Sequence, residues 1–183
     1  VLADGERAEL GDLAVFKDPS NGQVFVKRLM ARGGDRIALN AGVVEINQSK
    51  LEHVATATKT VPYLPAGPAQ SLPRCFSPVE LGGACVRQQV EERLTNGRVY
   101  STLSITDTGP GDTVDMVTVP EGEVFLLGDN RDNSFDSRFP RSIGGIGTVP
   151  EDDVFAVAER IHYSLSWGAR VTMRWGRMGQ VVE

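Results

Sequence analysis

Short apolar runs alternate with turn-forming residues along the whole chain, and this alternation constrains the fold more than any other feature. The 183 residues include 20 glycines and 10 prolines, which are spread along the sequence and not gathered in one linker. Apolar runs such as Val124–Leu127 have the length of a strand, and long helical periodicity is absent. The sequence therefore predicts an all-β fold with frequent turns.

Three hairpins are predicted from turn clusters that separate apolar segments. One of them joins Ile37–Leu39 to Val43–Ile46 through Asn40-Ala41-Gly42. An Asp-Pro-Ser-Asn-Gly cluster lies between Leu13–Phe16 and Val24–Met30, and the turn 95–98 lies between Gln88–Leu94 and Val99–Ile105. Further strands are expected at Val117–Val119, Val124–Leu127 and, with period-two alternation, Val154–Leu165.

The character of the sequence changes between residues 50 and 111, where prolines, polar residues and both cysteines occur with weak periodicity. We interpret residues 50–111 as a smaller β lobe inserted into an antiparallel β core. Residues 1–49 and 112–183 would then form the two parts of that core.

Charge and hydropathy argue against nucleic-acid binding and against a membrane-spanning helix in these residues. The net charge is −5 and no run of lysine or arginine could neutralise several phosphates, so nucleic-acid binding is not expected. No stretch approaches the roughly 20 apolar residues that a membrane-spanning helix needs. The chain begins at Val1 without a starting methionine or a signal-peptide pattern, so we expect it to begin inside a longer protein.

Cys75 and Cys85 are the only cysteines. With no histidine or third cysteine nearby, a zinc site is not expected. Their spacing alone leaves two alternatives open, namely a pair of buried thiols and a disulfide that closes a loop rich in glycine and proline.

Lys27 is the first candidate catalytic residue. In the predicted strand, alternation places Lys27 on one face with Phe25 and Leu29. Removal of the amine from water would lower its pKa and allow it to act as a neutral general base. The alternative is a lysine on an edge strand with its ammonium in water, where it discourages aggregation.

The second candidate is the segment 128–138, in which ten of eleven residues are polar or glycine. Asp/Arg pairs could lock the shape of such a loop. A solvated loop and a calcium site are the alternatives. The calcium site fits poorly, because Arg131 falls at a ligand position and Ser134 falls where the loop glycine belongs.

Three segments stand out along the chain, namely Gly11–Phe16, Val26–Leu29 with Gly34–Ile37, and 128–138. In this order they resemble signature boxes of bacterial type I signal peptidases, which are serine–lysine dyad enzymes. The resemblance runs from about Gly11 to Ser164, and residues 128–138 are its most specific part. Val119–Gly122 and Val149–Pro150 also fit the family pattern.

The resemblance implies an all-β core with a smaller β lobe and a lysine that replaces the histidine of the familiar triad. Lys27 would be the general base, and Ser134 would orient its amine. Gly128 would leave space beside the lysine. Phe25 and Val26 would help to line shallow pockets for small side chains.

The same resemblance implies two ion pairs that hold the loop against the Lys27 strand. These are Arg28 with Asp129, and Asp136 with Arg138. A disulfide between Cys75 and Cys85 is favoured as well, because the domain would face an oxidising compartment.

The nucleophile is the main departure from the family pattern, whose catalytic serine lies in an upstream Ser-Met-Pro-type motif. No Ser-Met and no Ser-X-Met-Pro sequence occurs in the 183 residues. Ser20 and Ser49 are in turns, so neither is expected to substitute. We expect that the serine segment lies upstream and that this chain alone is inactive. Arg32-Gly33-Gly34, where a proline is usual, should alter only a turn.

The substrates implied are signal peptides of exported preproteins, cleaved after small-X-small sites such as Ala-X-Ala. The implied location is the bacterial inner (plasma) membrane, held by an N-terminal transmembrane anchor, with the catalytic domain against the membrane surface on the extracytoplasmic, periplasmic side. A monomer without metal or organic cofactor is expected. The rival functions are a binding module of the same fold and a self-cleaving repressor-type domain.

Two groups of residues have no role in this scheme. His53 and His162 are expected to pack or to lie on the surface. An aromatic and basic stretch near the C-terminus would either pack or contact the membrane interface; it comprises Trp167, Arg170, Arg174, Trp175 and Arg177.

Overall fold

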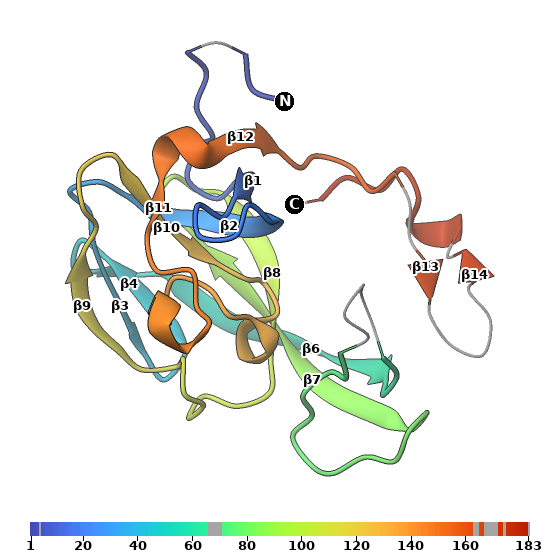
Figure 1. Cartoon of the computed structure of the whole chain (residues 1–183). Coiled ribbons are helices and arrows are strands. Elements are labelled where there is room, and N and C mark those ends of the chain that lie inside the picture. The colour runs from blue at the N-terminus through green and yellow to red at the C-terminus, as the bar shows by residue number, and fades with distance from the viewer. Residues whose placement is uncertain (4, 66–70, 163–164, 167–171, 174, 183) are drawn as a thin grey trace.

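The computed structural model describes residues 1–3, 5–65, 71–162, 165–166, 172–173 and 175–182. The fold is all-β, as the sequence predicts, and every pair of strands in these ranges is antiparallel. Within the described ranges the strands form sheets of five, four, three and two strands. Turns and single 3₁₀ turns join them (Figure 1).

The five-stranded sheet carries Lys27 and has the order β11-β10-β2-β1-β12. The hairpin predicted at residues 13–30 forms β1 and β2, with Leu13 paired to Arg28 and Lys17 to Val24. The strands are β1 (Leu13–Lys17), β2 (Val24–Arg32), β10 (Glu123–Leu127), β11 (Val149–Pro150) and β12 (Val154–Val157).

The other sheets have the orders β5-β4-β3-β9, β6-β7-β8 and β13-β14. Their strands are β3 (Arg36–Asn40), β4 (Val43–Ile46), β5 (Ser49–Lys50), β6 (Glu52–Pro62), β7 (Ala84–Arg93), β8 (Val99–Ser104), β9 (Val114–Thr118), β13 (Leu165–Ser166) and β14 (Thr172–Met173). The 3₁₀ turns are η1 (Arg131–Asn133), η2 (Arg141–Ile143), η3 (Glu151–Asp153) and η4 (Trp175–Arg177).

Residues Leu29–Ala31 of β2 and Val124–Leu127 of β10 are buried on both faces, which explains the apolar run in each strand. Met30 and Phe125 belong to a core cluster shared with the four-stranded and three-stranded sheets, whereas Leu29 and Leu126 belong to a second cluster with Phe16. Because successive side chains point to opposite faces, one strand supplies both cores. Lys27 lies just before the part of β2 that is buried on both faces, and this burial fixes the position of the Lys27 backbone.

The four-stranded sheet contains the predicted hairpin of β3 with β4, and the three-stranded sheet contains that of β7 with β8. Its third strand, β6, was not predicted, because its residues are mostly exposed and show no alternation. The far ends of β6 and β7 project beyond the two larger sheets (Figure 1). All three strands lie within residues 50–111, although the division of the chain at those boundaries stays a prediction.

The predicted final strand was too long. The prediction ran from Val154 to Leu165, but β12 ends at Val157. Its partner β1 begins at Leu13, whose carbonyl accepts from the Ala158 amide, so β1 offers no edge beyond that point. Further along, Arg160 forms only an isolated antiparallel bridge with Val181. Residues 163–164 of the predicted strand lie outside the described residues.

Candidate active site

Lys27 lies at the point where β10 leaves β2. Pairing between these strands ends at Leu127 with Arg28, and Gly128 turns away beside the lysine. Lys27 is half-buried, on the same face as Phe25, which packs against Phe16 with ring centroids 5.9 Å apart. Burial lowers the pKa of Lys27 from its ordinary value of 10.5, although the charge of Asp136 opposes this effect.

The loop 128–138 brings Ser134 to Lys27. Lys27 Nζ and Ser134 Oγ form a hydrogen bond in which the amine donates. A Cβ added at Gly128 would lie 2.5 Å from Ser134 Cβ and 3.4 Å from Lys27 Nζ. Any larger residue at position 128 would therefore displace the serine, and the absence of a side chain there permits the contact.

The structure contains both ion pairs that the resemblance implies. Arg28 donates from Nε and Nη2 to the two oxygens of Asp129 at 2.8 and 2.7 Å. Asp136 is fully buried; it accepts from Arg138 Nε and Nη2 at 2.8 and 2.9 Å and from the Gly128 amide at 2.9 Å. These bonds fix both ends of the loop, because they join oppositely charged side chains and, at Gly128, a buried backbone amide to a carboxylate.

Strand β8 holds the middle of the loop, and the sequence did not predict this role. The Leu103 amide donates to the Asp129 carbonyl at 2.7 Å. Asp132 Oδ2 accepts from the Ile105 amide at 2.6 Å and from Ser104 Oγ at 3.1 Å. The segment 128–138 is therefore not a solvated loop.

A buried ion pair between Glu92 of β7 and Arg131 of the loop was also missed. Glu92 is fully buried and Arg131 is 5% exposed. Alternation along β7 could have indicated it, because Glu92 shares a buried face with Val90 and Leu94. A carboxylate at an apolar position requires a buried partner.

Cys75 and Cys85 form a disulfide that closes a loop against the same site. The Arg74 amide donates to Asn133 Oδ1 at 3.4 Å, and the Arg74 guanidinium lies 5.9 Å from the centroid of the Phe135 ring. The disulfide therefore connects β7 to the residues that flank Ser134.

Removal of this disulfide should destabilise the protein by about 2–3 kcal/mol, the loop-closure entropy expected for a sequence separation of 10. The measurement is urea unfolding of a Cys75→Ser/Cys85→Ser double variant against the oxidised protein. A Ser77→Ala variant within the same loop is the control. An unchanged midpoint in the double variant would contradict the prediction.

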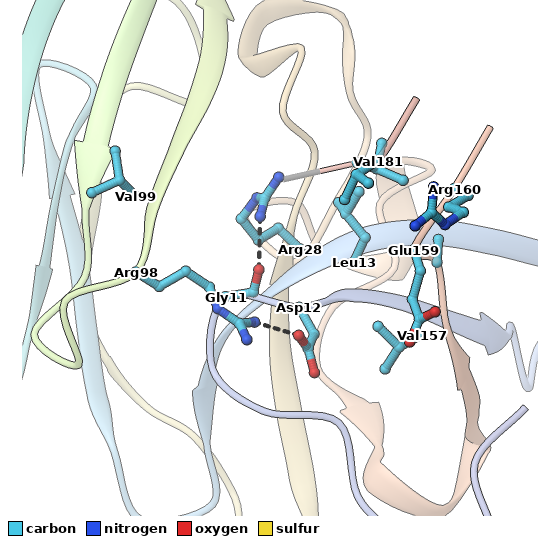
Figure 2. Close-up of a pocket in the computed structure, with 12 residues that line it drawn as sticks. Gly11, Asp12, Leu13, Arg28, Arg98, Val99, Val157, Glu159, Arg160 and Val181 are labelled. Carbon is cyan, nitrogen blue, oxygen red and sulfur yellow. Dashed lines mark hydrogen bonds and ion pairs between the residues drawn. The ribbon is translucent and has the colours of Figure 1, made fainter. Parts of the chain in front are cut away.

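A pocket between β1 and the C-terminal residues lies beside Arg28 (Figure 2). There Arg28 Nη1 donates to the Gly11 carbonyl at 2.7 Å, and Arg98 bonds to Asp12. Lys27 and Ser134 do not line this pocket. The pocket is therefore lined by residues that hold β2 in place, and it is separate from the Lys27–Ser134 pair.

The remaining candidates lie apart from Lys27. Ser20 Oγ donates to Asp18 Oδ1 at 2.8 Å, and Ser49 belongs to β5 in another sheet. His53, for which no partner was predicted, lies 3.3 Å from Glu92, and His162 is exposed. Val26 is the exception, since it directly precedes Lys27 in β2, and it is 49% exposed.

In the aromatic and basic stretch near the C-terminus, Trp175 is 70% exposed and Arg177 is exposed. Trp167, Arg170 and Arg174 lie outside the described residues. Among described side chains, no group of three histidine, cysteine, aspartate or glutamate residues could hold a metal ion.

A family model described as signal peptidase, peptidase S26, matches residues 3–163. The chain therefore belongs to this family, and the resemblance expected from its three segments is confirmed.

The similar relatives include signal peptidase I of Rickettsia canadensis, Rickettsia akari and Rickettsia prowazekii. Identity is 32% over 169 residues, 31% over 172 and 32% over 168, respectively. Each match covers 87% of this chain and 54% of the relative, so the chain spans about half the length of the curated relatives it matches. A crystal structure of a signal peptidase I from Enterococcus faecalis is similar over 83% of this chain and 97% of that chain, with 20% identity and a TM-score of 0.43.

Proposed function

We propose that the protein removes signal peptides from exported preproteins by cleavage after small-X-small sequences. Lys27 would act as general base for a serine nucleophile that lies outside these 183 residues. The observation that carries the proposal is the hydrogen bond between the half-buried Lys27 amine and Ser134. Membership of the signal peptidase family supports the substrate class.

The chemistry follows from the lowered pKa of Lys27, which leaves a larger fraction of its amine neutral. As the serine oxygen attacks the scissile carbonyl carbon, Nζ accepts the serine proton and then delivers it to the departing amine, which becomes the new N-terminus. Water attacks the resulting ester and gives a proton to Nζ, and the serine leaves with that proton. Ser134 would keep the Nζ lone pair directed toward the nucleophile.

The substrate would bind as an extended strand along the open edge of β2. Strand β1 pairs with Val24 through Arg28 on one side of β2, but β10 pairs only from Arg28 onward. Among the described strands, none pairs with β2 on the β10 side between residues 24 and 27. The exposed side chain of Val26 and the half-buried Phe25 would form the walls that accept only small side chains.

The rate should rise with pH through the pKa of Lys27. Below that pKa the amine is protonated and cannot accept the serine proton; above it the base is free. Because burial lowers the pKa, the midpoint of the rise in kcat/KM should lie below pH 10.5. The measurement is kcat/KM from pH 5 to 11 with an uncharged peptide; a profile that only begins to rise at pH 10.5 would contradict the prediction.

The proposal is tested by cleavage of an Ala-X-Ala preprotein peptide by the full-length protein, with the products identified by mass spectrometry. The expected product ends at the second alanine. Substitution of phenylalanine for that alanine should abolish cleavage, while substitution at the middle position should have little effect. If the full-length protein binds the peptide without cleaving it, a binding module replaces the peptidase.

Location at the bacterial plasma membrane with the catalytic domain on its outer side is part of the same proposal. The relatives are bacterial proteins. In the described ranges, no helix has both the length and the apolar character needed to cross a membrane.

A further inference from the structure

We propose that Glu92 is a positioning residue for the Lys27–Ser134 pair, holding the loop through Arg131 and the Lys27 strand through Tyr100. This inference rests on the proposed function, because it assigns the network to the same reaction. It adds a residue of β7 that lies in the lobe and that none of the three sequence motifs contains.

The three-stranded sheet assembles the network in one cross-strand row. The register pairs His53 of β6 with Glu92 of β7, and Glu92 with Tyr100 of β8. Tyr100 Oη donates to Glu92 Oε2 at 2.8 Å. His53 Nδ1 lies 3.3 Å from Oε1, without hydrogen-bond geometry. Side chains in such a row share one face of the sheet. The strand register therefore helps to set the position of the Glu92 carboxylate, in addition to the Glu92 rotamer.

Glu92 holds the loop through Arg131. Arg131 Nη1 donates to Oε1 at 2.7 Å and Nη2 donates to Oε2 at 2.5 Å, a bidentate arrangement that fixes orientation as well as distance. Arg131 begins the turn η1, which ends one residue before Ser134. Its carbonyl accepts from Arg138 Nη2 at 2.6 Å. A shift of Arg131 would therefore move Ser134 relative to Lys27.

Tyr100 connects the same carboxylate to β2. The Arg28 guanidinium lies 4.1 Å from the centroid of the Tyr100 ring, and Arg28 is the residue directly after Lys27. The ring is 2% exposed, so this cation–π contact is desolvated and strong. Glu92 thus connects to both sides of the Lys27–Ser134 contact, one through an arginine and one through a tyrosine.

The charge at position 92 is maintained although burial opposes it. Burial alone would raise the pKa of Glu92, but the Arg131 charge, the adjacent His53, and the Arg131 and Tyr100 hydrogen bonds lower it to about 2. A buried ion pair is a weak source of stability, since an apolar replacement of equal volume is often as stable. Orientation of the loop therefore explains the pair better than stability does.

The test compares kcat and KM of full-length Glu92→Gln protein with those of Glu91→Gln, which changes an exposed neighbour on the same strand. Loss of positioning should lower kcat about tenfold to 10²-fold with little change in KM, whereas Glu91→Gln should behave as the parent. In a Ser134→Ala background, Glu92→Gln should have almost no further effect. An equal loss in both backgrounds, or an unchanged kcat, would overturn the proposal.

A second readout does not depend on cleavage. In protein labelled with ¹³C at lysine Cε, the Lys27 resonance should titrate at a higher pH in Glu92→Gln, because the displaced loop would leave the amine more hydrated. An unchanged midpoint overturns the inference even if the parent cleaves, and a shifted midpoint supports it even if the parent does not. If Glu92→Gln does not fold, Tyr100→Phe removes one hydrogen bond and should lower kcat about fivefold, with the titration shifted in the same direction.

Discussion

Replacement of Lys27 by alanine should lower kcat for an Ala-X-Ala preprotein peptide by about 10²- to 10⁴-fold in the full-length protein. The variant loses the amine that donates to Ser134, and with it the acceptor for the nucleophile's proton. KM should change little, because the substrate would pair with the main chain of β2, which an alanine side chain leaves intact. The measurement is initial rate against substrate concentration at the pH of maximum activity.

A Lys59→Ala variant is the matched control, since Lys59 lies exposed on β6. It should retain the activity of the parent. If Lys27→Ala cleaves as fast as Lys59→Ala, Lys27 is not the general base and the proposed chemistry is wrong. Both variants should show the same thermal unfolding midpoint within a few degrees, so that a loss of rate is not a loss of fold.

Replacement of Asp136 by alanine should destabilise the protein by about 3–5 kcal/mol, the usual cost of removing one partner of a buried ion pair. The variant leaves the Arg138 guanidinium, whose side chain is 1% exposed, without its carboxylate, and the Gly128 amide without its acceptor. The unfolding temperature should fall by about 6–20 °C, measured by circular dichroism.

Asp115→Ala provides the control, because Asp115 is exposed on β9. Its unfolding temperature should stay within about 2 °C of the parent. A similarly small shift for Asp136→Ala would show that the loop does not depend on this pair. In that case the position of Ser134 would rest on Asp129, Asp132 and the Glu92–Arg131 pair.

The parts of the fold that were predicted from sequence have strong local signals. The hairpins β1–β2 and β7–β8 are bounded by turn clusters that set both their ends. Strand β6 carries no such signal, because its side chains face solvent and its position is fixed only by pairing with β7. The end of β12 depends on the length of its partner, which the alternation in β12 itself does not contain.

The residues of the candidate site also fall into two groups, those that the sequence indicated and those that it did not. Lys27, Ser134 and the two ion pairs lie in segments with a specific motif, so a resemblance could indicate them. Glu92 and Tyr100 lie in a segment without one, and their role depends on the cross-strand register of the three-stranded sheet. Residues brought together by pairing between distant strands could not be assigned from the sequence of each strand alone.

The most direct test of the central claim is to trap the acyl-enzyme. Full-length protein would be mixed with an ester of an Ala-X-Ala peptide, quenched in acid and digested, and the acylated residue would be identified by mass spectrometry. The account predicts an acylated serine outside these 183 residues, with labelling lost in Lys27→Ala. Acylation of Ser134, or labelling that persists in Lys27→Ala, would contradict it.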